Sequence, residues 1–199
     1  KGQSTNLPML ARLAELGCNL TDYETVRDDE GRRLIFFGRY AGLAGAIDTL
    51  WALGQRLRSE GVRSPFEAIA PAHTYASLDD ARAAVRTAGG AIQSTGLPAG
   101  VAPLVIGITG YGHVASGVRE LLSDLPITEI EPRDLASLRA RDVARSLVQV
   151  TFKEEHTVEP RDPRHRFELQ DYYDHPERYR SVFARHLPRL TVLLNCNYW

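Results

Sequence analysis

The stretch LVIGITGYGHVASG, residues 104–117, decides the fold of this protein. It begins with an apolar run, passes through two glycines spaced one residue apart, and continues into a new amphipathic segment. The apolar run predicts a buried strand, and the amphipathic segment predicts a helix. The stretch therefore predicts a strand, a tight glycine turn and a helix in direct succession.

The turn fits the pattern G-x-G-x-x-G/A, with Gly110, Gly112 and Ala115 at its three small positions. The first glycine permits the tight turn, the second lets the backbone approach a pyrophosphate, and the alanine lets the helix pack against the strand. Unpaired N–H groups at the helix N-terminus would hold the phosphates. The alternative is a structural turn that binds nothing, but the strand before it and the helix after it favour a dinucleotide site.

Three polar residues near this turn are further candidates for cofactor binding. Glu131 closes the next predicted strand, about 20 residues beyond the turn, where a carboxylate that binds ribose hydroxyls belongs. Arg133 follows two residues later and could instead meet a 2′-phosphate, so the pair leaves NAD and NADP both open. His113 lies inside the turn, where its ring could approach a phosphate or cover the turn.

Predicted strands and helices alternate along the chain. Further strand-like runs are ITEIE, SLVQVTF and TVLLNC, and residues 6–17, 40–60 and 77–96 predict helices, as does RDLASLRARD. The runs NLTDYETV and RRLIFFG predict two more strands, joined by a turn at DDEG. Strands that alternate with helices predict an α/β fold with a parallel sheet, here a Rossmann-like domain.

Composition excludes several classes of function. The 199 residues are 43% apolar and 25% charged with a net charge of −1, which is ordinary for a globular protein and gives no sign of a nucleic-acid or membrane surface. Two cysteines provide no disulfide framework, so we expect a cytoplasmic protein. The histidines and carboxylates of residues 154–175 lack the spacing of a known metal motif, so we expect no metal.

Two long stretches resemble one enzyme family. DDEGRRLIFFGRYAGLAGAIDTLWALGQRL resembles the lysine–2-oxoglutarate reductases and saccharopine dehydrogenases, which share a G-x-R turn, a strand ending in F-G and an aromatic-A-G-x-A-G helix start. RDPRHRFELQDYYDHPERYRSVFARHLPRLTVLLNCNYW and the loop TGYGHVASG resemble the reductase branch. The wider family includes alanine dehydrogenase and transhydrogenase, and the resemblance covers nearly the whole chain.

The resemblance implies a domain plan in which the chain is a fragment. Residues 1–40 would be the C-terminal part of an N-terminal α/β substrate domain, residues 41–100 a connecting helix and interdomain segment, and residues 101–199 an incomplete Rossmann-like dinucleotide-binding domain. The family's catalytic Lys and His would both precede Lys1. We therefore expect no catalytic acid–base residue in this chain, and little or no activity from the chain alone.

The resemblance also assigns roles to individual residues. The substrate-binding positions are Gln3, Arg33, which would hold a carboxylate, and Phe37. The cofactor-binding positions are Gly112 and His113 at the pyrophosphate, Glu131 at the ribose, Tyr198 beside the dinucleotide, and Arg32, which is matched mainly in the saccharopine dehydrogenase branch. Without the resemblance, Arg32 and Arg33 would be interpreted as a solvated pair beside the acidic residues of the turn.

The implied function is the reductive condensation of L-lysine with 2-oxoglutarate to saccharopine, with NADP or NAD as cofactor, in lysine degradation. The alternatives are a saccharopine dehydrogenase that forms lysine, and a catalytically inactive dinucleotide-binding regulatory module. The expected partners are the small-molecule substrates, with no nucleic acid and no membrane. Formation of a homo-oligomer is left open.

Overall fold

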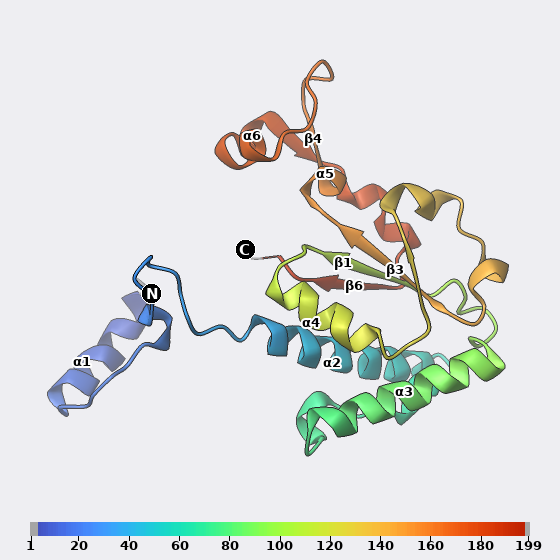
Figure 1. Cartoon of the computed structure of the whole chain (residues 1–199), viewed down its shortest axis with the longest axis horizontal. Coiled ribbons are helices and arrows are strands. Elements are labelled where there is room, and N and C mark those ends of the chain that lie inside the picture. The colour runs from blue at the N-terminus through green and yellow to red at the C-terminus, as the bar shows by residue number, and fades with distance from the viewer. Residues whose placement is uncertain (1–3, 198–199) are drawn as a thin grey trace. The chain divides into compact units, whose positions relative to one another are not determined.

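The computed structural model describes residues 4–197 and divides the chain into two compact units, one ending at Phe37 and one beginning at Gly38 (Figure 1). The first unit contains the 3-10 turns η1 (Ser4–Asn6) and η2 (Tyr23–Thr25) and the helix α1 (Leu7–Glu15). The helix predicted over residues 6–17 therefore forms as α1, with a proline in its first turn and Gly17 after its end at a φ of 63°. None of the residues of α1 is buried.

The DDEG turn forms as predicted, but the two strands beside it do not. Gly31 has a φ of 77°, and the backbone N–H of Arg32 donates to Oδ1 of Asp28 over 2.7 Å. Within residues 4–37 the only strand-like pairing is a single antiparallel bridge between Arg27 and Arg33. The prediction of two strands was therefore wrong beyond one bridge. Apolar side chains after the turn, such as Leu34, stay exposed, so no packed face supports a longer ladder.

The second unit is built on a four-stranded parallel sheet, which confirms the α/β fold class. Its strands are β1 (Val105–Thr109), β2 (Ile127–Ile130), β3 (Leu147–Phe152) and β6 (Val192–Asn195). They lie in the order β2-β3-β1-β6, so β3 separates β1 from the strand that follows it in the chain. A short antiparallel pair, β4 (Val158–Pro160) and β5 (Tyr179–Ser181), forms a separate ribbon.

Helices cover one face of the parallel sheet, and 3-10 turns cover the other (Figure 1). The first face packs against α2 (Gly38–Ser59), α3 (Leu78–Thr95) and α4 (His113–Leu122), with η3 (Pro65–Ala68) and η4 (Ala72–Thr74) beside them. The second face lies under η5 (Pro132–Ala136), η6 (Ala140–Val143), η8 (Phe183–Arg185) and η9 (Leu187–Arg189). The remaining elements are α5 (Glu154–Thr157), α6 (Leu169–Asp174) and η7 (Pro176–Arg178).

The predicted helix over RDLASLRARD is instead the two 3-10 turns η5 and η6. Leu135 and Val143, one from each turn, are buried against the second face of the sheet. Pro132 starts the first turn, and the segment bends between the two anchors rather than continuing as one helix. In residues 4–197 no helix combines the length and the apolar character that crossing a bilayer requires.

Two glycines let α2 and α4 pack backbone against backbone. A Cβ atom added at Gly117 would lie far inside van der Waals contact with the carbonyl oxygen of Arg39, and one added at Gly42 would meet the carbonyl oxygen of Val114 in the same way. The two contacts are reciprocal, since each helix presents its glycine to the other's backbone. Of the small residues at the start of the predicted helix 40–60, Gly42 therefore serves this crossing.

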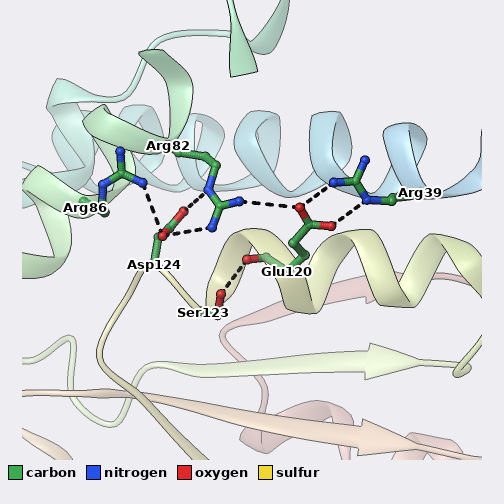
Figure 2. A network of polar contacts seen from close by, with 6 residues as sticks. All are labelled: Arg39, Arg82, Arg86, Glu120, Ser123 and Asp124. Atoms are coloured by element: carbon green, nitrogen blue, oxygen red, sulfur yellow. Dashed lines mark hydrogen bonds and ion pairs between the residues drawn. The ribbon is translucent and has the colours of Figure 1, made fainter. Parts of the chain in front are cut away.

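A network of ion pairs joins α2, α3 and α4, and it includes Asp124, which follows the end of α4 (Figure 2). Arg39 of α2 forms a bidentate pair with Glu120 of α4, with N–O distances of 2.6 and 2.7 Å. Arg82 of α3 binds Asp124 in the same manner, at 2.7 and 3.2 Å, and its third nitrogen lies 3.5 Å from Glu120. Arg86 approaches Asp124 at 3.5 Å. The hydrogen bond from Arg39 lowers the pKa of Glu120 below its ordinary value of 4.5.

We expect Glu120→Gln to lower the thermal midpoint at pH 7 and to have less effect at pH 3. Because the folded pKa of Glu120 is lowered, its carboxylate stabilises the fold above the ordinary value of 4.5, and this contribution is lost as the pH falls through the folded pKa. Thermal unfolding at both pH values measures the difference. Glu60→Gln, in the exposed pair with Arg56, is the control and should change little at either pH. Equal losses for Glu120→Gln at both pH values would contradict the expectation.

Candidate functional site

The glycine turn lies at the carboxyl end of β1, where ligands bind in parallel α/β sheets. Gly110 has a φ of 88°, and its N–H donates to the carbonyl oxygen of Phe152 at the end of β3 over 2.9 Å. A Cβ atom at this position would lie 2.5 Å from Oδ1 of Asn197. The fold itself therefore requires glycine at the first position of the motif.

Gly112 is a glycine that the fold does not require. It caps α4 with a φ of −77°, which any residue adopts, and a Cβ atom there would meet nothing within 4 Å. The carbonyl oxygen of Gly112 accepts the N–H of Ser116 over 2.9 Å, while the first N–H groups of α4 have no partner within the helix. An open space above these donors is what a bound pyrophosphate needs, so this part of the site fits a dinucleotide.

The other two cofactor-binding candidates of the glycine turn, Ala115 and His113, differ in burial. Ala115 is fully buried at the start of α4, as its predicted packing role requires. His113 is the first residue of α4 and is exposed beside the open space. Its contact with a cofactor stays a prediction, as does that of Gly112.

Because of the strand order, Glu131 does not follow the strand that lies next to β1. The dinucleotide-binding pattern expects this carboxylate after a strand that lies next to β1. Here Glu131 follows β2, and β3 lies between β2 and β1, so the residues nearest the glycine turn on this side are those after Phe152. Arg133 lies in η5, also beyond β2, with an exposed side chain. The roles of Glu131 and Arg133 stay predictions.

The ribbon β4–β5 and helix α6 bring Tyr173 toward the turn, which no sequence spacing could indicate. The hydroxyl of Tyr173 donates to Oε1 of Glu154 over 2.9 Å. This bond, together with burial and the neighbouring Tyr111 of the glycine turn, raises the pKa of Tyr173 to about 12. Tyr172 and Tyr179 instead pack edge to face, with their ring centres 5.3 Å apart.

In the first unit, Arg32 and Arg33 differ sharply in environment. The side chain of Arg32 is 75% exposed and is paired with Asp28 and Glu30 of its own turn. Arg33 is 31% exposed and lies 3.3 Å from Glu24. The Nε atom of Arg33 is buried and has no hydrogen-bond partner among the residues described.

Aromatic rings surround Arg33. Its guanidinium carbon lies 5.8 Å from the ring centre of Tyr23 and 5.6 Å from that of Phe36. Phe37 packs edge to face on Tyr23 at 5.4 Å. A planar guanidinium held by rings and 31% exposed is suited to pairing with a carboxylate.

Comparisons with known proteins identify the family of the chain. No protein-family model matches it. An alpha-aminoadipic semialdehyde synthase of Arabidopsis thaliana is 39% identical over the whole chain, and the mitochondrial enzymes of that name from Mus musculus and Bos taurus are 33% and 34% identical. The chain belongs to the lysine–2-oxoglutarate reductase and saccharopine dehydrogenase family. It spans 20% of the length of the Arabidopsis relative and 22% of the mammalian ones.

The family's expected positions are only partly described by the structure. Gln3 and Tyr198 lie outside the described residues. Among residues 4–197, no group of three or more His, Cys, Asp and Glu side chains could hold a metal ion. Burial raises the pKa of the Cys196 thiol, which makes this cysteine a poor nucleophile.

Proposed function

We propose that this chain is part of a lysine–2-oxoglutarate reductase that condenses L-lysine with 2-oxoglutarate to saccharopine using NADPH or NADH. The open space at Gly112, where α4 begins, is the observation that carries the dinucleotide half of this proposal. Identity of 39% over the whole chain to an alpha-aminoadipic semialdehyde synthase supports the substrate half. We retain the domain plan of residues 1–40, 41–100 and 101–199 as part of the proposal.

In this reaction the residues of the chain bind and orient the dinucleotide and a substrate. The dinucleotide, when bound, supplies the hydride. The N-terminus of α4 holds its pyrophosphate, with Gly112 leaving room for close approach and His113 beside it. Arg33 holds a substrate carboxylate through its planar fork, while the ε-amine of lysine and the ketone of 2-oxoglutarate lose water to form an imine. The resemblance assigns the proton transfers to a Lys and a His that precede Lys1.

The reverse reaction, lysine formation by a saccharopine dehydrogenase, is the second candidate. Its main sequence argument is Arg32, which that branch places near the cofactor. Because Arg32 is paired with both Asp28 and Glu30, its donors are engaged within its own turn, which favours the reductase direction. We propose that the protein is cytoplasmic, because its two cysteines provide no disulfide framework. The alternative is the mitochondrion, since the mouse relative carries that word in its name.

Two measurements test the proposed function. Fluorescence titration of the chain with NADPH and NADH should reveal saturable binding. The polypeptide in which this sequence occurs should oxidise reduced dinucleotide only when both lysine and 2-oxoglutarate are present. Binding of NADPH or NADH without any lysine-dependent oxidation would support the regulatory module instead. If neither dinucleotide binds, the proposed function is contradicted.

We expect Arg33→Ala to raise the KM for one carboxylate substrate by about tenfold to a hundredfold, the scale of a lost charge-assisted hydrogen bond. Arg33→Lys keeps the charge but not the fork, so its effect should be smaller. Steady-state kinetics with each substrate varied separately measures both. Arg32→Ala is the matched control and should leave these constants unchanged. Normal constants for Arg33→Ala would show that the carboxylate is held elsewhere.

A further inference from the structure

A cavity of about 380 Å³ lies between the turn after β2 and the turns before β6. Its lining is strongly basic and contains no Asp or Glu. The charged and titratable residues in it are Arg133, His156, Arg185, His186 and Arg189. Three guanidinium groups around one cavity repel one another, so an anion bound between them would be stabilised.

The three arginines keep most of their N–H donors free. Nε of Arg185 donates to Nε2 of His186 over 3.2 Å, and Nη1 of Arg189 lies 3.4 Å from the carbonyl oxygen of Leu135. Arg133 makes no hydrogen bond or ion pair with the residues that the structure describes. Burial, and then the charge of Arg185, lower the pKa of His186, so its ring accepts the bond from Arg185 in the neutral form. Arg185 is thereby oriented while its Nη2 atom stays available.

Two carboxylates approach the lining residues without neutralising the three arginines. Oε1 of Glu155 lies 3.8 Å from Nε2 of His156. Oε2 of Glu159 lies 4.0 Å from Nη1 of Arg185, at the limit of an ion pair. Glu159 is already held by Arg180, whose Nε and Nη2 lie 2.8 and 2.5 Å from its Oε1. The positive charge of the cavity therefore remains largely uncompensated within this part of the chain.

The strand order puts this cavity on the ribose side of the glycine turn. In dinucleotide-binding folds the ribose lies at the carboxyl end of the strand beside the first one. Here that strand is β3, and His156, four residues after its last residue Phe152, lines the cavity together with Arg133 from the turn after β2. Glu131 is not among the lining residues, although it precedes them directly.

We propose that the cavity binds a phosphate monoester, with the 2′-phosphate of the dinucleotide as its occupant and Arg185 and Arg189 as its principal ligands. The occupant, but not the cavity's affinity for phosphate, rests on the proposed function. A phosphate monoester offers several charged acceptor oxygens at once, which matches guanidinium groups converging from two directions. Cofactor choice would then depend on η8 and η9, far along the chain from the glycine turn, rather than on Glu131.

Calorimetry of the chain with adenosine 2′,5′-bisphosphate, adenosine 5′-monophosphate and inorganic phosphate tests the proposal. The bisphosphate should bind at least about tenfold more tightly than the monophosphate, as expected from one charge-assisted hydrogen bond or more. Arg185→Gln and Arg189→Gln should remove this difference and leave the affinity for the monophosphate unchanged. Arg141→Gln, an exposed arginine on η6, is the matched control and should preserve the difference. Unfolding curves check that each variant is folded.

The other outcomes separate this inference from the proposed function. Equal affinities for the two nucleotides would overturn the 2′-phosphate assignment while leaving a dinucleotide site. If inorganic phosphate binds in that case, and Arg185→Gln abolishes this binding, the cavity is a site for free phosphate. If neither nucleotide binds, the proposed function fails, and the phosphate titration alone decides the cavity: binding lost in Arg185→Gln supports it, and no binding overturns it.

Discussion

Gly112→Val weakens dinucleotide binding by at least about a hundredfold, equivalent to roughly 2.7 kcal/mol, and leaves the fold intact. The reason is that the new side chain enters the open space at the N-terminus of α4, where no atom other than those of its chain neighbours lies within 4 Å of its Cβ. It therefore collides only with a ligand. Fluorescence titration with NADPH and NADH measures the affinity, and thermal unfolding measures the fold.

The matched control for this result is Gly45→Val. Gly45 is an exposed glycine of α2 whose added Cβ also meets nothing within 4 Å. The control should leave cofactor affinity unchanged, because it lies on a helix that does not form the turn. Unchanged affinity in Gly112→Val itself would remove the glycine turn from the binding site.

Gly117→Ala destabilises the chain by about 2 kcal/mol or more and lowers the thermal midpoint by at least roughly 4–8 °C. A single methyl group has this effect because it would meet the carbonyl oxygen of Arg39, which belongs to a helix backbone and cannot rotate away. The helices α2 and α4 must separate, and the core between them loosens. Gly42→Ala should have a similar effect, since its contact with Val114 is the reciprocal one.

Gly90→Ala is the matched control and should change stability in the opposite direction. Gly90 is exposed within α3, and a Cβ atom there meets nothing within 4 Å. Alanine is favoured over glycine inside a helix, so this variant should gain about 0.5–1 kcal/mol. Urea unfolding of Gly117→Ala and Gly90→Ala measures both changes in the free energy of unfolding, which should have opposite signs. A neutral Gly117→Ala would mean that the helices do not cross as closely as described.

Local signals in the sequence determined the strand β1, the glycine turn and the helices α1, α2, α3 and α4, but they predicted a helix wrongly over RDLASLRARD. The apolar run at 104–109 can only be buried, a φ of 88° at Gly110 favours glycine, and the side chain of Ser77 caps α3 by accepting the N–H of Asp80 over 3.2 Å. Each of these features acts over a few residues, so the sequence indicates it directly. The same holds for the DDEG turn, whose hydrogen bonds stay within five residues.

Only the tertiary structure decided which strand lies beside β1 and what surrounds the site. The sequence predicted the strand that ends at Glu131, but the place next to β1 is taken by β3, because pairing depends on packing between segments far apart in the chain. Likewise, Arg133 and Arg185 line one cavity although about 50 residues separate them, a long-range contact that no local pattern encodes. Local periodicity specifies an element, whereas the neighbours of that element depend on the whole fold.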